Sequence, residues 1–467
     1  MIVGGCQIMQ DETLKIEGAK FIITMDPERK IIEDGSIVIE GQRITRVGKA
    51  AELVDVSADR VIDAKDMVVT PGFCNAHMHI SYAHATRGIF PDNLGAQYLP
   101  NVFKLQGVMT EEEEYYTSLL AITELLKYGT TSFLDPGSTK FLDACMHAYE
   151  ESGCRIVVGS QVADLTNPIN IPVCSTEEAV NIMEKTIRCY DHRANDRVRA
   201  WAMPFSADYS TQELLVAAKR LADEYGTSMT LHQLNSESSV NNHKQRYGKR
   251  PVEYLESIGV LGSNVLLAHL VGINEDEIDC IARTQTKAVM CPTAALKAGT
   301  GTSANGKLPE MLAKGVCVGL GTDAGNNSNL VETMRSMYLV AVIYKDARQD
   351  TNMIPAESAL EMATVKGAEA LGLLDDIGSL EPKKKADLVL FDTRRAEWRT
   401  LFNPVNNLVY NADGRSVHTV IVDGKIVVEG HKPVFVDEWK LIQKVQEFGE
   451  SMLARAGIDF PGRWPII

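Results

Sequence analysis

Four histidines and one aspartate stand out because each lies at or near the end of a short apolar run. His77 and His79 flank one methionine at the end of VVTPGFCNAHMH, and side chains two positions apart in a strand point the same way. The other three end later runs, with His232 in SMTLHQLN, His269 in VLLAHLVG and Asp323 in GLGTDAG. If these runs end at one place, three imidazoles and a carboxylate can bind a divalent transition metal with a position left for water.

The elements that must position these side chains are short apolar runs that alternate with amphipathic stretches. Eight runs read as strands, at 68–79, 130–137, 155–164, 198–208, 228–235, 265–272, 287–294 and 317–325. Repeated strand and helix units favour a closed (β/α)8 barrel, or TIM barrel, whose sites lie at the C-terminal ends of the strands. An open doubly wound sheet is the rival, but no GxGxxG follows the first strand. We therefore predict an α/β fold in which all five side chains meet at one barrel mouth.

Both ends of the chain have a different residue pattern, in which β-branched residues alternate with polar ones. This alternation runs through 20–49 and returns in KADLVLFD (385–392) and HTVIVDGKIVVEG (418–430). Two such distant segments predict one small bipartite β-sandwich domain. The predicted organisation is a β-sandwich of residues 1–67 and 377–434, a metal-dependent barrel of residues 68–376, and a C-terminal helical tail of residues 435–467.

One connection, from residue 80 to residue 110, is long and shows no clear helical period. Long ordered loops usually have a function, and in a barrel this one would overhang the mouth as a substrate lid. It contains three candidate substrate contacts: His84, Arg87 and Tyr98. Each has a plain alternative, which is an ordinary histidine outside the site for His84, a surface position for Arg87 and core packing for Tyr98.

Composition excludes several classes of partner. The 467 residues include 47 basic and 62 acidic side chains, so the formal charge is -15, the wrong sign for binding nucleic acid or an anionic membrane. The nine cysteines are scattered without a CxxC pair, and we read neither an export signal nor a membrane span. We expect a cytoplasmic protein with a small-molecule substrate, whose helical tail could pack on a second copy to form a homo-oligomer.

At these motifs the chain resembles the amidohydrolase superfamily, in particular its chlorohydrolase and deaminase branch, which includes guanine, adenosine-analogue and triazine enzymes. The matching segments are VVTPGFCNAHMH with Arg87 beyond it, LLAHLVG, GLGTDAG and ATVKGAEALG (363–372), and the resemblance spans nearly the whole chain. It implies that His269 is a hydrogen-bonding or proton-handling neighbour of the metal. The metal ligands that it implies are His77, His79, His232 and Asp323.

The resemblance also bears on how many metal ions bind. Binuclear members of the superfamily use a carboxylated lysine or a carboxylate at the end of strand four. Here that strand reads AWAMPFSAD, which has no lysine, and Asp208 is expected to lie beyond the metal. We therefore expect one divalent transition metal ion per chain, with zinc preferred and iron, cobalt or manganese as alternatives.

One departure from the branch bears on the substrate. Its deaminases usually place a glutamate three residues after the strand-five histidine to protonate a ring nitrogen, and here that residue is Asn235. A carboxamide cannot shuttle a proton at neutral pH, although Glu237, two residues on, could substitute. Phenylurea and thiocarbamate hydrolases of the superfamily resemble this chain in lacking the glutamate. Asn235 would then orient a substrate oxygen or nitrogen.

The predicted function is thus a mononuclear metal-dependent hydrolase of a carbon–nitrogen bond other than a peptide bond. Metal-bound hydroxide would attack a small urea, carbamate or amide, with Asp323 as proton acceptor and donor and His269 stabilising the oxyanion. The alternative is a hydrolytic deaminase or dechlorinase of an N-heterocycle of purine, pyrimidine or s-triazine type. Two other classes stay open, a scaffold on a dead amidohydrolase fold and a metal-dependent isomerase or lyase.

Overall fold

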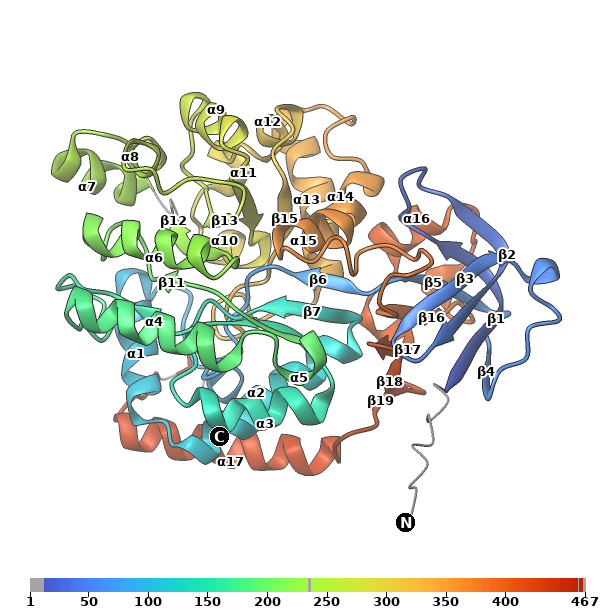
Figure 1. The fold of residues 1–467 in the computed structure, drawn as a ribbon. Coiled ribbons are helices and arrows are strands. Elements are labelled where there is room, and N and C mark those ends of the chain that lie inside the picture. The colour runs from blue at the N-terminus through green and yellow to red at the C-terminus, as the bar shows by residue number, and fades with distance from the viewer. Residues whose placement is uncertain (1–11, 234–236, 461, 465–467) are drawn as a thin grey trace, which may run out of the picture.

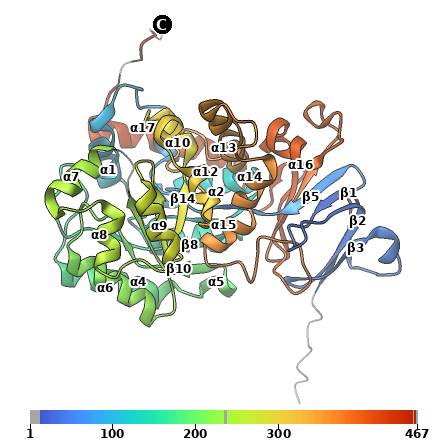
Figure 2. The same ribbon diagram turned by 90° about the horizontal axis from the view of Figure 1, so that it is seen from above.

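The structure, a computed structural model, describes residues 12–233, 237–460 and 462–464. A barrel surrounded by helices lies beside a smaller β domain (Figure 1), and the view from above places this domain at one side of the barrel (Figure 2). The β domain is built from both ends of the chain, as predicted. Its strands are β1 (Thr13–Ile23), β2 (Ile31–Glu40), β3 (Arg43–Lys49), β4 (Arg60–Asp63), β5 (Met67–Pro71), β16 (Leu388–Asp392), β17 (Val417–Val422), β18 (Lys425–Glu429) and β19 (Lys432–Pro433).

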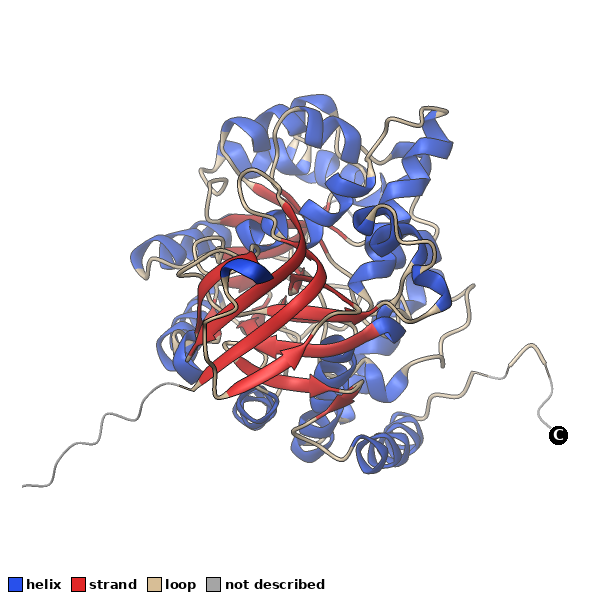
Figure 3. Cartoon of the chain, turned by 90° about the vertical axis from the view of Figure 1, so that its right-hand side faces the viewer, coloured by secondary structure: helices blue, strands red, loops and turns tan. Residues whose placement is uncertain are grey.

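These strands form one sheet in the order β19-β18-β17-β16-β5-β1-β2-β3, with β4 paired to β1. Figure 3 shows the sheet face-on, with the helices of the barrel around and behind it. The strands of this sheet bury apolar residues in a common core, although β5 is buried along its whole length and β4 has no buried residue. Ile16 of β1 and Ile37 and Ile39 of β2 are fully buried in a core shared with Leu388 of β16.

The chain passes from the β domain to the barrel at Gly72. Before it, β5 pairs with β16, and after it, β6 (Phe73–Asn75) is the first barrel strand. A Cβ atom on Gly72 would lie 2.0 Å from Oγ1 of Thr131, so only glycine fits this crossing. The sequence analysis assigned the whole run from residue 68 to the barrel. A continuous apolar run does not reveal where a buried strand leaves one sheet for another.

All eight predicted barrel strands are present. After β6 they are β7 (Thr130–Leu134), β8 (Arg155–Val158) with β9 (Gln161–Val162), β10 (Val198–Ala200) with β11 (Met203–Pro204), β12 (Met229–Gln233), β13 (Val265–His269), β14 (Lys287–Met290) and β15 (Val318–Leu320). Backbone hydrogen bonds join the first four barrel strands to the last four at both seams. They run from Thr230 N to Ala202 O at 3.1 Å and from Ala76 N to Leu320 O at 2.8 Å. Strand eight is therefore bonded to strand one, and the barrel is closed.

Amphipathic helices cover the barrel, as in α4, where Ala179, Met183 and Ile187 face inward at helical spacing. The helices that follow the strands are α2 (Glu111–Lys127), α3 (Leu142–Ser152), α4 (Thr176–Tyr190), α5 (Arg193–Asp196), α6 (Gln212–Glu224), α7 (Glu237–Tyr247), α8 (Pro251–Ser257), α9 (Glu275–Arg283), α10 (Pro292–Lys297), α11 (Thr302–Asn305), α12 (Leu308–Ala313), α13 (Thr333–Arg348), α14 (Ala356–Ala363) and α15 (Val365–Ala370), with α16 (Pro404–Asn406) in the β domain.

The long connection of residues 80–110, which we call the lid, is partly helical. It contains two 3₁₀ turns, η2 (His84–Thr86) and η3 (Gly95–Gln97), and the helix α1 (Tyr98–Val108). The sequence showed no helical period here because α1 is buried on two sides. Val102 and Leu105 pack in the core of the lid, whereas Phe103 belongs to a separate cluster with Phe205 of the barrel.

The C-terminal helix α17 (Glu438–Ala456) packs against its own chain. Its buried face, which includes Leu441, Val445 and Met452, lies on α2, α1 and η2. This apolar face is covered by the chain's own helices and is not free to pack on a second copy. The homo-oligomer stays a prediction. Across the described ranges, no helix is both long enough and apolar enough to cross a bilayer.

Candidate metal centre

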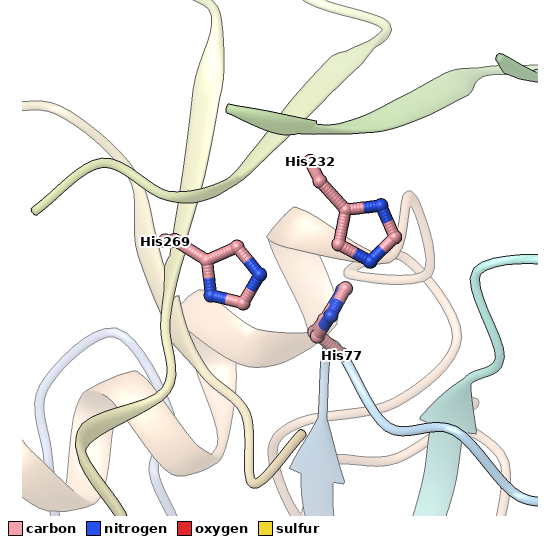
Figure 4. A group of neighbouring side chains, drawn as sticks. All are labelled: His77, His232 and His269. Atoms are coloured by element: carbon pink, nitrogen blue, oxygen red, sulfur yellow. The ribbon is translucent and has the colours of Figure 1, made fainter. Parts of the chain in front are cut away.

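Three imidazoles from three strands converge at the mouth of the barrel. His77 follows β6, His232 lies in β12 and His269 ends β13, and Figure 4 shows the rings gathered around a common point. The ring centroid of His77 lies 4.8 Å from that of His232 and 5.0 Å from that of His269. Their nitrogens form one group in which all ligand atoms lie within 4.8 Å of one another.

His79 and Asp323 join the same cluster. Nε2 of His79 lies 3.4 Å from Oδ1 of Asp323 and 3.3 Å from Nε2 of His232. A second group with ligand geometry therefore consists of His77, His79 and Asp323. The structure thus brings together all five residues that the sequence analysis singled out. Among the described residues no other His, Cys, Asp or Glu joins them, and Asp208 instead accepts a hydrogen bond from Ser239.

The unpaired nitrogens of this cluster fit a bound cation. Both ring nitrogens of His77 and Nδ1 of His79 are buried without a hydrogen-bond partner. A buried polar atom without a partner costs about 1–3 kcal/mol, so an unfilled cluster of this kind is unfavourable. A divalent transition metal bound by imidazole nitrogens and a carboxylate would remove that cost.

Neighbouring groups orient the ligand candidates. The carbonyl oxygen of Phe205 lies 3.0 Å from Nδ1 of His232, so Nδ1–H donates to it and Nε2 faces the cluster. Asn75 bonds the loop after β15 twice, because its amide donates to Oγ1 of Thr322 and accepts from the Thr322 N–H. The histidine strand and the aspartate loop are therefore tied together by a residue that the sequence analysis passed over.

Asp135, at the end of β7, is a second residue that the sequence analysis missed. It is 1% exposed, and its Oδ2 accepts from the N–H of Ile80, directly after the His77–His79 pair. Its Oδ1 accepts from the N–H groups of Gly137 and Ser138. Asp135 thus anchors the end of the histidine strand. The available signal was a lone acidic residue inside the apolar run SFLDPG.

Electrostatics keeps His77, His232 and His269 neutral and the Asp323 carboxylate charged. Burial and the adjacent His79 lower the pKa of His232 to about 3, and burial also lowers the pKa of His77 and His269. Burial by itself would raise the pKa of Asp323, but the surrounding imidazoles, His269 first, hold it below its usual value. Neutral imidazoles and an ionised carboxylate are the forms that bind metal. His269 and Asp323 also have φ of 79° and 61°, an uncommon backbone region that clusters at functional sites.

The candidate substrate contacts of the lid bond other side chains rather than the cluster itself. His84 and Arg87 both contact Glu124 of α2, at 3.1 Å from His84 Nε2 and 2.7 Å from Arg87 Nη2. The hydroxyl of Tyr98 donates to Oδ1 of Asn326 at 2.9 Å. Asn235 lies outside the described residues. Glu237 begins α7, but its side chain is not described. A substrate-binding role stays a prediction for all of them.

An apolar wall borders the cluster on the side of β11 and β12. The ring of Phe205 stacks on that of His232 with centroids 4.7 Å apart, and Phe103 packs on Phe205 from the lid. Ile169 and Ile171, from the loop after β9, complete this wall. Aromatic and aliphatic side chains beside polar metal ligands suit a ring-shaped substrate.

Comparisons with known proteins agree with this geometry. The model of the amidohydrolase family matches residues 68–427. The 5′-deoxyadenosine deaminase of Methanosarcina mazei is 33% identical, covering 93% of this chain and 97% of that protein. The 5-methylthioadenosine/S-adenosylhomocysteine deaminase of Syntrophomonas wolfei is 30% identical, covering 93% and 98%. The fold is that of an adenosine deaminase from Xanthomonas campestris with bound zinc, with a TM-score of 0.86, 24% identity and coverage of 94% and 98%.

Proposed function

Because this chain belongs to the amidohydrolase family, we propose that it is a metal-dependent deaminase acting on the adenine ring of a nucleoside. Water replaces the exocyclic amine on the ring carbon, and ammonia leaves. The observation that carries the proposal is the agreement of the curated relatives. Both are named as deaminases of adenosine derivatives, and each matches 93% of this chain.

This proposal corrects the preference drawn from the sequence. The sequence analysis favoured a urea, carbamate or amide because Asn235 replaces the usual glutamate. No relative named above acts on such a substrate, and the relatives favour the stated alternative, a hydrolytic deaminase of an N-heterocycle. The urea, carbamate or amide substrate is thus left without support from the relatives, and the deaminase alternative is the better supported of the two.

The metal site takes a single ion, held by His77, His79, His232 and Asp323, and zinc is the ion that we propose. A divalent ion bound there supplies a Lewis acid that makes water a stronger nucleophile at neutral pH. Zinc is the metal named with the structurally similar adenosine deaminase. Strand four contributes no further ligand within the described residues, in keeping with one ion.

Asp323 moves the proton in this proposal. Its carboxylate is ionised, so it accepts one proton from the attacking water and passes it to the departing amine, which leaves as ammonia. The second proton of the water leaves the new hydroxyl as it becomes the carbonyl and ends on the adjacent ring nitrogen. His269, neutral and on the neighbouring strand, donates a hydrogen bond to the oxygen that becomes the product carbonyl. The rings of Phe205 and Phe103 provide the apolar surface against which the purine lies.

The test is a substrate panel with zinc-loaded protein. Adenosine, 5′-deoxyadenosine, 5′-methylthioadenosine and S-adenosylhomocysteine form one arm, and phenylureas with carbamates form the other. We expect ammonia release only in the first arm, with one solvent oxygen in each product molecule. Amine release from a urea, without ammonia from any adenosine derivative, would overturn the proposal.

A further inference from the structure

Two consecutive asparagines follow the aspartate of strand eight, and the second of them, Asn327, bonds that aspartate. Its Nδ2 donates to Oδ2 of Asp323 at 3.1 Å, while the backbone N–H of Ala324 donates to Oδ1 at 2.7 Å. Both carboxylate oxygens are therefore held from within their own loop. The rotamer of Asp323 depends on where Asn327 lies.

Asn326 makes its bonds in the opposite direction, to the lid. It is 1% exposed, its Nδ2 donates to Oγ1 of Thr86 at 2.9 Å, and its Oδ1 accepts from the Tyr98 hydroxyl at 2.9 Å. Thr86 lies in η2 and Tyr98 begins α1, so one amide bonds two separate parts of the lid. The side-chain amide of Asn326 does not titrate, so a change of pH does not alter its hydrogen-bonding groups.

The two amides belong to one rigid turn. The N–H groups of Asn327 and Ser328 both donate to the carbonyl of Ala324 at 2.9 Å. Lys297 of α10 donates to the carbonyl of Asn327 at 3.0 Å and fixes the turn from the outside. Asn326 therefore cannot shift without moving Asn327.

We propose that Asn326 and Asn327 are positioning residues that couple the docking of the lid to the orientation of Asp323. When the lid is docked, Tyr98 and Thr86 hold Asn326, and the turn presents Asn327 to the carboxylate. When the bonds of Asn326 to Tyr98 and Thr86 are lost, the carboxylate of Asp323 loses its fixed rotamer and binds the ion less tightly. Tyr98 then acts through Asn326 rather than by touching substrate, which differs from the role that the sequence suggested.

The experiment measures how fast zinc leaves the protein in excess chelator, which requires no substrate. Tyr98→Phe removes one hydroxyl and keeps the ring, and Asn327→Ala removes the amide at the other end. Changing a residue that orients a metal ligand typically costs 10–100-fold in metal affinity, so we expect each variant to lose zinc roughly tenfold faster. The double variant should lose zinc no faster than the faster single variant, because both changes break the same chain of bonds.

Tyr115→Phe is the matched control, since the Tyr115 hydroxyl bonds Glu151 on the surface, outside the lid and the site. Its zinc release should equal that of the unchanged protein. Asn327→Ser keeps a short donor and should release zinc at a rate between those of Asn327→Ala and the unchanged protein. A Tyr98→Phe rate equal to wild type, or single-variant effects that multiply in the double variant, would overturn the coupling.

A kinetic readout separates positioning from substrate contact. On the best adenosine derivative, Tyr98→Phe should lower kcat with KM within about twofold, whereas loss of a substrate contact would raise KM. This arm rests on the proposed function, but zinc release does not. Failure to deaminate any adenosine derivative would therefore reject the proposed function and leave the coupling to be judged by zinc release alone.

Discussion

The imidazoles at the barrel mouth are held to different degrees. His232 is fixed by its bond to the Phe205 carbonyl, whereas the nitrogens of His77 and Nδ1 of His79 have no protein partner among the described residues. Ligands of this second kind gain most from a bound ion. They also contribute least to the fold when no ion is present.

His79→Ala should therefore remove metal without unfolding the barrel. We expect metal content well below one ion per chain, loss of activity by several orders of magnitude, and an unchanged circular dichroism spectrum. The matched control is His192→Ala, because His192 is exposed and remote from the cluster. Collapse of the fold in His79→Ala would show that the histidine serves structure rather than catalysis.

Asn235→Glu tests the missing acid. Attack on a heteroaromatic ring carbon places charge on the ring nitrogen, so a carboxylic acid at this position should leave deaminase activity intact or raise it. The measurement is kcat/KM on 5′-deoxyadenosine at equal metal content, with Asn235→Gln as the neutral control of the same length. A fall of about 100-fold for the glutamate variant alone would argue for an oxyanion at this position instead.

The cluster of His84, Arg87 and Glu124 should contribute stability that depends on pH. Burial by itself raises the pKa of Glu124, but His84 and Arg87 outweigh it and lower that pKa to about 2, against 4.5 for an unperturbed glutamate. A lowered folded-state pKa stabilises the protein fully above pH 4.5 and progressively less as pH falls towards 2. Glu124→Gln should therefore lower the urea midpoint at pH 7, and the difference from wild type should shrink between pH 4.5 and pH 3. A difference that stays constant over this range would contradict the assignment.

At the scale of the element, Ser and Thr hydroxyls cap the starts of helices, and adjacent candidates can compete for this position. Ser175 caps α4 as its capping sequence predicts, with the Glu178 N–H bonded to its hydroxyl. At the start of α6, Ser210 and Thr211 are adjacent candidates for the cap, and the Thr211 hydroxyl is the one that accepts from the Leu214 N–H. Adjacent Ser and Thr residues are equivalent as caps, so packing of the helix decides which one is used.

Helix α17 approaches the lid closely enough to require glycine. A Cβ atom on Gly449 would lie 2.2 Å from the carbonyl oxygen of Ala85 in η2, and a backbone atom cannot move aside easily. Gly449→Ala should lower the melting temperature, with a loss on the order of 1–3 kcal/mol as for other overpacked sites. Gly107→Ala is the control, because Gly107 is also helical but has open space around its Cβ position, and it should be neutral or stabilising. Equal melting temperatures for the two variants would refute a tight contact.

At the scale of the whole molecule, buried charges join the two domains. Arg155 of β8 donates from Nε and Nη2 to both oxygens of Asp387 at 2.8 and 3.0 Å. Its Nη2 also contacts Asp423 at 3.4 Å, and Lys385 bonds the same carboxylate at 3.0 Å. All four residues are buried, and together they attach the barrel to the β domain.

Arg155→Met should destabilise the protein by about 3–5 kcal/mol, because it leaves buried carboxylates without their main partner. The measurement is equilibrium unfolding in urea, with Lys20→Met as the control. Lys20 pairs with Glu33 on the surface, so its removal should leave the urea midpoint nearly unchanged. Similar losses for both variants would mean that the buried pair does not hold the domains together.

The sequence by itself determined the barrel, the bipartite β domain and the five clustered side chains. Alternation along a strand, and the position of a residue at its end, are local properties that short stretches of sequence express directly. Only the tertiary structure decided that Gly72 is the crossing between sheets, that His84 and Arg87 turn to Glu124, and that Asn326 bonds the lid. Each of these features depends on which distant segments pack together, and hydrogen bonds between residues as far apart as Tyr98 and Asn326 leave no periodic trace in the chain.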